Sequence, residues 1–162
     1  MILVDVTETE VERPKHGQNP WYSGKQKCHT IKTQIVICAK TKVVIAVFVC
    51  RGSTHDFTMW KKSIGVKVVK HIKIQADSGY QGIQKLHKNS ETPKKKTKCK
   101  PLTKEQKAYN RQIGSERIGI EHVNRRLKRF RIFSGRYRNR RRRFGLRISL
   151  FCGLYNFDLA IS

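Results

Sequence analysis

The period of the hydrophobic pattern changes along the chain, and this change limits the folds that the chain can adopt. Up to about residue 76, apolar and polar residues alternate over short stretches, which is typical of half-buried strands. After Thr103, apolar residues recur with the spacing of long amphipathic helices. Strands followed by helices predict a mixed α/β fold in which helices pack on a sheet.

The strand-like part contains four predicted strands, over residues 1–12, 29–39, 42–49 and 66–76. The middle two form a hairpin that turns near Lys40 and Thr41. We expect the first strand and the hairpin to be antiparallel, and the last strand, which follows a crossover, to be parallel. Short helices are expected over residues 57–63, capped by Thr54 or Asp56, and over residues 81–88.

The second part is predicted to be helical. Thr103, with Gln106 three residues later, has the spacing of a capping box and begins a helix that extends to about Phe130. A basic connector over residues 90–101 precedes it, and a break over residues 134–139 separates it from a final helix over residues 140–160. The length predicts one domain, residues 1–162, whose basic C-terminal helical part covers about 103–162.

The charge balance indicates a polyanionic partner. The chain has 36 Lys and Arg against 11 Asp and Glu, a formal net charge of +25. Nucleic acid is the commonest partner of such a surplus. Residues 125–147 contain no acid and are predicted to form a phosphate track, with a solvated helix face as the alternative. The arginines assigned to this DNA-binding track are Arg125, Arg129, Arg140, Arg141, Arg142 and Arg143.

Other classes of protein find little support. The 5 cysteines form no CxxC pair and no zinc-like spacing with the histidines, which favours free thiols in a reducing interior. The longest apolar runs, residues 43–50 and 148–155, are too short to span a bilayer, so no membrane partner is expected.

Three of the scarce acids occupy informative positions. Asp5 lies mid-strand between apolar residues, Asp77 ends a strand, and Glu121 lies in the long helix. Arg117, Glu121 and Lys128 fall within about 40° on that helix, about 100° from its apolar stripe, so Glu121 can point toward the sheet edge. Converging carboxylates suit Mg²⁺ or Mn²⁺, and a pair of such ions supports phosphoryl transfer.

Simpler interpretations of these residues remain open on spacing alone. Arg117 and Glu121 have the spacing of an ordinary helical ion pair, and Asp77 that of a turn residue. Asp5 is also free to pair with a nearby lysine.

The order of several motifs resembles DDE-type insertion-sequence transposases of the retroviral-integrase-like group, over essentially the whole chain. The matching segments are Asp5-Val6-Thr7, Arg13-Pro14, Tyr22-Ser23-Gly24-Lys25, His29-Thr30-Ile31-Lys32, His55-Asp56, Asp77-Ser78-Gly79-Tyr80, Arg117 with Glu121 and Lys128, and residues 138–146.

The resemblance implies an RNase H-like mixed sheet flanked by helices and a Mg²⁺-dependent endonuclease that also transfers strands by a 3′-hydroxyl. It implies that Asp5, Asp77 and Glu121 hold two Mg²⁺ or Mn²⁺ ions, and that Arg117 and Lys128 contact terminal DNA. The implied partners are double-stranded DNA, at the transposon ends and the target, and a second copy in a homodimer. The implied location is the bacterial cytoplasm, at the nucleoid.

The sequence departs from the family pattern at two places. Gly114 stands where the family often has Tyr, and only four residues precede Asp5, so the N-terminal helix-turn-helix of such proteins is expected to be missing. Two alternative functions are a non-catalytic basic nucleic-acid-binding protein and a repair or recombination nuclease on the same scaffold.

Other polar and aromatic residues have two interpretations each. His55-Asp56 is expected to end a strand and cap a helix, with a catalytic role as the alternative. Trp21, Tyr22 and Trp60 either stack on bases or pack in the protein. Glu8, Glu10 and Glu12 share one face of the first strand and are expected to face solvent.

Overall fold

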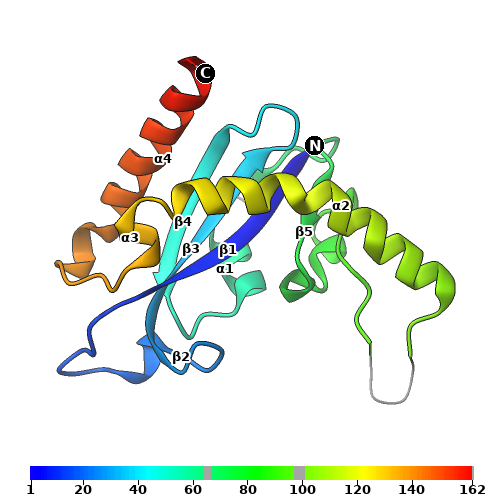
Figure 1. Cartoon of the computed structure of the whole chain (residues 1–162). Coiled ribbons are helices and arrows are strands. Elements are labelled where there is room, and N and C mark those ends of the chain that lie inside the picture. Colours follow the sequence, from blue (N-terminus) through cyan, green and yellow to red (C-terminus); the bar gives the residue numbers. More distant parts are fainter. Residues whose placement is uncertain (64–66, 97–100, 162) are drawn as a thin grey trace.

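The computed structural model describes residues 1–63, 67–96 and 101–161. Within these residues, a six-stranded mixed sheet is flanked by helices (Figure 1). The strands are β1 (Ile2–Glu10), β2 (Tyr22–Ser23), β3 (Cys28–Cys38), β4 (Val44–Arg51), β5 (Ile74–Ala76) and β6 (Ser90–Glu91). The helices are α1 (Asp56–Lys62), α2 (Lys104–Leu127), α3 (Arg131–Ser134) and α4 (Phe144–Ile161), with 3-10 turns η1 (Asn19–Trp21), η3 (Ser78–Tyr80), η4 (Ile83–Lys85) and η5 (Arg141–Arg143).

The main strands are ordered β4-β3-β1-β5-β6, and β2 pairs with the beginning of β3. Strand β3 is antiparallel to both β1 and β4, whereas β1, β5 and β6 run parallel. The predicted antiparallel hairpin and the parallel crossover strand are therefore confirmed. This curled mixed sheet with helices is consistent with an RNase H-like α/β fold.

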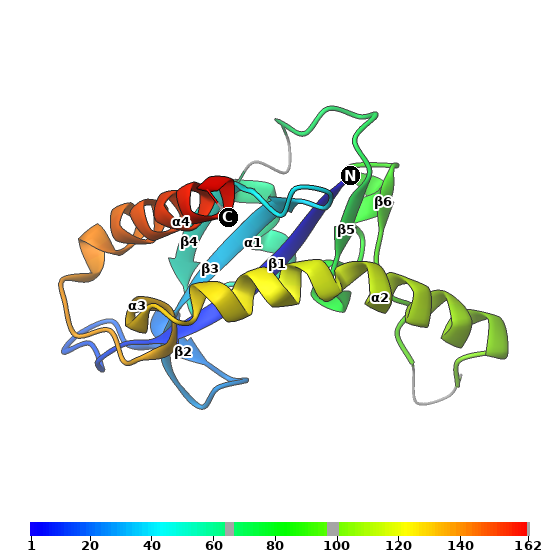
Figure 2. The same cartoon turned by 45° about the horizontal axis from the view of Figure 1, so that its top comes forward.

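Strand β1 separates two hydrophobic cores because its side chains alternate between the faces of the sheet. Leu3 packs in the larger core, under α2, α3 and α4. Val4 packs in the smaller core, with Trp60 of α1 and Ile83 of η4. Figure 2 shows α2 running across the front of the sheet, α4 beside β4, and α1 behind the sheet. Each odd-numbered residue at this end of β1 thus points toward α2.

Helix α2 lies across the sheet and carries the predicted apolar stripe. Its buried apolar residues are Ile113, Ile120, Val123 and Leu127. At its start, the Thr103 hydroxyl accepts a hydrogen bond from the Gln106 amide, and the Gln106 side chain accepts one from the Thr103 amide. The capping box predicted from these two residues is confirmed, and it fixes where α2 begins.

Helix α4 packs along β4. Phe144, Ile148 and Tyr155 are buried against the larger core, and the Asn156 amide pairs with both backbone groups of Val44. Residues 141–161 are long and apolar enough to cross a membrane, although a core helix of a folded domain passes the same test. Here one side of the helix is fastened to the sheet.

Several predicted boundaries were wrong. The strand expected over residues 66–76 is ordered as β5 only from Ile74, after a turn in which the Ile72 amide bonds to the Val69 carbonyl; its residue 66 lies outside the described residues. The helix expected over 81–88 is only η4, because Gly82 has a left-handed backbone, φ 91°. Helix α1 is capped by His55, and the connector contains the edge strand β6.

Candidate active site

Asp5 lies in the middle of β1 and points toward α2, away from the core that holds Val4 and Val6. Its side chain is 24% exposed. Arg117 Nη2 donates to Asp5 Oδ1 at 3.2 Å, and Asn124 Nδ2 donates to Oδ2 at 2.7 Å. Both oxygens of this carboxylate are therefore held by α2.

The electrostatic environment of Asp5 opposes its ionisation. Burial raises the pKa of Asp5 above its ordinary value of 3.8, because desolvation outweighs the attraction of the Arg117 guanidinium. The neighbouring Asp77 carboxylate raises the pKa further. Arg117 is only 8% exposed and also donates to the Val4 carbonyl at 3.1 Å, so it is fixed in place beside Asp5.

Asp77 is the first residue after β5. The parallel register pairs Val4 with Ala76, so the residues that follow them, Asp5 on β1 and Asp77 just after β5, lie side by side. The Asp77 carboxylate accepts a hydrogen bond from the Ser78 amide and caps η3. Both aspartates line one groove of about 520 Å³. The predicted proximity of these two acids is thus present in the fold.

Glu121 lies on α2 between Arg117 and Asn124, on the helix face that contacts Asp5, and its side chain is exposed. In the part of the chain that the structure describes, no three His, Cys, Asp or Glu side chains lie close enough to hold a metal ion. The structure therefore brings Asp5 and Asp77 together without joining the Glu121 carboxylate to them.

The groups beside Asp5 nevertheless suit a hard cation. Asp5 and Asp77 offer carboxylate oxygens, and the Asn124 amide oxygen is buried without a hydrogen-bond partner among the described residues. Hard oxygen ligands of this kind are those that Mg²⁺ prefers. A cation here would also relieve the repulsion between Asp5 and Asp77.

The His55-Asp56 motif builds the opposite side of the groove. His55 caps α1, and its Nδ1 accepts from the Phe57 amide at 3.3 Å, so the cap expected of the His55-Asp56 pair is present, although the pair does not end a strand because β4 already ends at Arg51. Lys32 Nζ donates to Asp56 Oδ1 at 2.8 Å. A Cβ on Gly79 would lie 2.9 Å from Asp56 Oδ2, so the glycine of the Asp-x-Gly-Tyr motif allows η3 to approach α1.

Further polar groups line the groove that contains Asp5, Asp77 and the His55-Asp56 motif. Lys128 caps the end of α2 and lines the groove with both aspartates. Tyr80 is buried, and its hydroxyl has no partner among the described residues. Glu8 was expected to face solvent, but its side chain is only 10% exposed and accepts a bond from the Thr30 hydroxyl at 2.8 Å. That expectation was wrong because the Glu8 side chain lies in the groove and packs against the Thr30 and Lys32 side chains of β3.

The other predicted DNA-binding residues are distributed around the C-terminal part. Arg125 and Arg129 are exposed on α2 and after it, and Arg141 is partly buried. The remaining exposed members are Arg140, Arg142 and Arg143. Arg117 differs from all of them, because its guanidinium is buried against Asp5; its contact with terminal DNA stays a prediction.

The aromatic residues separate into different environments. Trp60 is fully buried and meets Tyr80 edge to face, so it packs in the protein. Tyr22 is 43% exposed and stacks edge to face on His29. Trp21 lies between two arginine side chains.

Sequence reasoning missed Asn124. The helical rotation that grouped Arg117 with Glu121 and Lys128 also places Asn124 about 20° from Arg117, and this signal was present in the sequence. Lys32 was also missed as a site residue, because its pairing with Glu8 follows from the sheet register and its ion pair with Asp56 from the packing of α1 on the sheet.

Comparison with known proteins gives three findings. A sequence model described as DDE superfamily endonuclease matches residues 4–156. A protein of Microchaete diplosiphon named "Probable transposase for insertion sequence element IS702" is 54% identical over 161 residues. That alignment covers 99% of this chain and 58% of the relative, so the chain spans less than two thirds of the relative's length. No solved structure matches the chain.

Proposed function

Because the chain belongs to the DDE superfamily of endonucleases, we propose that it is the catalytic core of a transposase. In this proposal it cuts double-stranded DNA at the ends of an insertion element and joins the freed 3′-hydroxyl to target DNA. The observation that carries the proposal is the pair Asp5 and Asp77, set side by side in a groove that Lys128 also lines. Residues 1–162 form one catalytic domain in this proposal.

The proposed cofactor is Mg²⁺ or Mn²⁺, as two ions held by Asp5, Asp77 and Glu121. When bound, such ions activate an attacking oxygen and stabilise a leaving one. The donor set beside Asp5 supports this assignment, since it consists of oxygen atoms and includes the unpartnered Asn124 oxygen. Glu121 completes the set if its flexible side chain turns along the α2 face toward the aspartates.

Within this site, Arg117 and Asn124 act as positioning residues. Each donates to one oxygen of Asp5 and thereby fixes the plane of the carboxylate. Arg117 also lowers the cost of keeping Asp5 ionised in a desolvated position. Their task is to hold Asp5 ready to bind a cation in one orientation.

The basic residues around the groove bind the DNA backbone in this proposal. Lys128 lies in the groove itself and is placed to contact the phosphate next to the cut. The arginines of residues 125–143 extend the contact, which makes binding dependent on salt and only weakly on sequence. Two copies acting together on two DNA ends, in the cytoplasm and at the nucleoid, complete the proposal.

Incubating the protein with Mg²⁺ and DNA that carries element ends tests the proposal. We expect nicking at the ends and joined products, both lost in Asp77→Asn. Nicking without joining would favour a repair or recombination nuclease, and binding without any cleavage would favour a non-catalytic binding protein. Arg111→Gln, which removes a charge from an exposed position on α2, serves as the control and should cut normally.

A further inference from the structure

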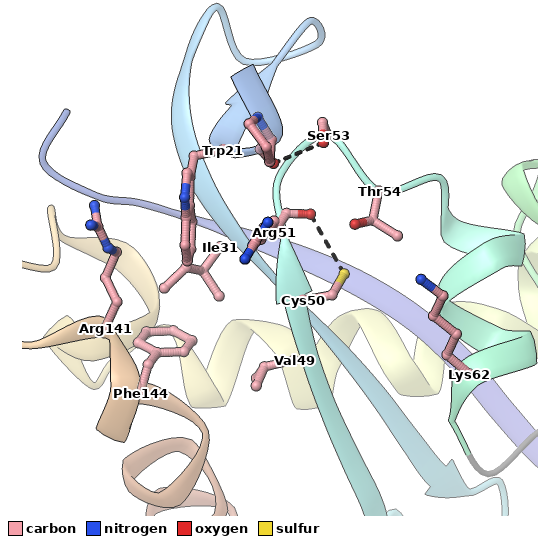
Figure 3. Close-up of a pocket in the computed structure, with 11 residues that line it drawn as sticks. Trp21, Ile31, Val49, Cys50, Arg51, Ser53, Thr54, Lys62, Arg141 and Phe144 are labelled. Carbon is pink, nitrogen blue, oxygen red and sulfur yellow. Dashed lines mark hydrogen bonds between the residues drawn. The ribbon is translucent and has the colours of Figure 1, made fainter. Parts of the chain in front are cut away.

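A second hollow adjoins the catalytic groove at the carboxyl end of β4. Its rim carries Trp21, Arg51, Lys62 and Arg141, and its floor is formed by apolar side chains that include Phe144 (Figure 3). The hollow has a volume of about 520 Å³, and no carboxylate lines it. It is therefore a cationic hollow with an aromatic wall.

The two arginines of the rim share one aromatic ring. The Arg51 Cζ lies 5.5 Å from the centre of the Trp21 ring and the Arg141 Cζ lies 4.7 Å from it. Figure 3 shows Trp21 between them. Stacking on a ring fixes a guanidinium and leaves its N–H edge free to donate. Neither arginine forms an ion pair within residues 1–63, 67–96 and 101–161, so their positive charges are uncompensated there.

The position of Trp21 is fixed by hydrogen bonds from the segment that follows β4. The Ser53 hydroxyl and amide both donate to the Pro20 carbonyl, at 2.8 and 3.2 Å. A Cβ on Gly52 would lie 2.7 Å from the Trp21 carbonyl oxygen, so only glycine allows the two segments to meet this closely. The backbone that carries Trp21 is thus held in place by the protein itself.

The hollow connects the catalytic groove to a third basic surface. Ser53 and Thr54 line both the catalytic groove and the hollow. Arg141 lines both the hollow and a further pocket that also contains Arg13 and Lys15. The three surfaces therefore form one continuous path that begins at Asp5 and Asp77.

We propose that this hollow binds the phosphodiester backbone of DNA beside the position of the cut. Arg51 and Arg141 donate to phosphate oxygens, and Trp21 holds the two guanidiniums in register. Arginine forks bind phosphate in this manner, and two guanidiniums held on one ring offer an anion several N–H donors at once. The inference rests on the proposed DNA substrate, and it adds a contact on the sheet side of the groove, away from the arginines of α2.

Binding of a fluorescently labelled DNA duplex to the Asp77→Asn protein tests the inference without any cleavage. Two double variants are compared in that background. The hollow variant carries Arg51→Gln and Arg141→Gln. The control variant carries Arg111→Gln and Lys107→Gln, and it loses the same charge from an exposed part of α2. We expect the hollow variant to bind about tenfold more weakly and the control to lose much less. The slope of log affinity against log salt should decrease by about 1 to 2 in the hollow variant.

Equal losses in the two double variants would overturn the inference, because they would show only the effect of net charge. Arg51→Gln alone is the second variant, since Arg141 also donates to the Glu12 carbonyl and its loss affects the local fold. Because binding is measured in a protein that is not expected to cut, the result stands apart from the proposed catalysis. If the unmodified protein cuts DNA normally but the hollow variant binds DNA as well as the control variant does, this inference is refuted and the proposed function stands.

Discussion

Replacing Arg117 with methionine tests whether α2 holds Asp5 through charge. The substitution keeps an apolar stem against the sheet and removes two hydrogen bonds, one to the Asp5 carboxylate at 3.2 Å and one to the Val4 carbonyl at 3.1 Å. Hydrogen bonds to charged groups contribute about 1.5 to 3 kcal/mol, and these lie at the long end of normal distances. We therefore expect the free energy of unfolding to fall by about 2 to 3 kcal/mol at neutral pH.

The loss should depend on pH, and its sign follows from Asp5. A carboxyl whose pKa is raised in the folded state destabilises the fold when it is ionised. This destabilisation by Asp5 is absent in acid and appears as the pH rises above 3.8, the ordinary pKa of the group. Arg117 offsets this cost only while Asp5 is charged. In acid, the substitution still removes the bond to the Val4 carbonyl and a weaker bond to the uncharged Asp5 carboxyl, but no ion pair is lost. The difference between the two proteins should therefore shrink to about 1 kcal/mol.

Urea unfolding followed by the fluorescence of the buried Trp60, at several pH values, measures this difference. The matched control is Arg136→Met, which breaks the exposed pair with Glu10 and should change stability by less than about 1 kcal/mol. A loss at Arg117 that stays constant from acid to neutral pH would refute the reasoning, because it would show that the Asp5 charge is not what Arg117 supports.

Three further changes test the site and the fold. Asn124→Ala leaves Asp5 Oδ2 without its 2.7 Å donor, and we expect slower cleavage with unchanged DNA affinity in a cleavage assay and a binding titration. Glu121→Gln should reduce the rise in melting temperature that Mg²⁺ or Mn²⁺ produces, whereas Glu105→Gln, in the first turn of α2, should not; equal rises would remove Glu121 from the metal site. Thr103→Ala should destabilise the chain by about 1 kcal/mol in thermal unfolding, since it removes the capping box, and an unchanged midpoint would contradict that role.

The parts of the fold that sequence reasoning predicted are those set by local rules. The β3–β4 hairpin follows from alternation, and the start of α2 follows from the spacing of Thr103 and Gln106. The parallel pairing of β1 with β5 follows from the crossover rule, and it was enough to place Asp5 near Asp77. The extent of β5 was not predictable in this way, because apolar and basic residues follow one another through the turn from Val69 to Ile72 as they do in a strand.

Helical periodicity explains both what was found and what was missed around Asp5. It gives the direction of a side chain around the helix axis but not the distance of that axis from the sheet. Arg117, Glu121, Asn124 and Lys128 all point the same way, yet Arg117 and Asn124 reach Asp5 while the Glu121 carboxylate does not join the two aspartates.

The length and chemistry of each side chain on this face of α2 then determine its role beside Asp5. Arginine is long and always charged, so it is suited to balance a buried carboxylate, and asparagine offers both a donor for Asp5 and an oxygen that has no partner among the described residues. Glutamate, exposed one turn from each, would repel Asp5 and Asp77 if it approached them alone. A cation between the three carboxylates would turn that repulsion into attraction. The face of α2 that holds Asp5 in place therefore also carries Glu121, the carboxylate that a metal ion would bind.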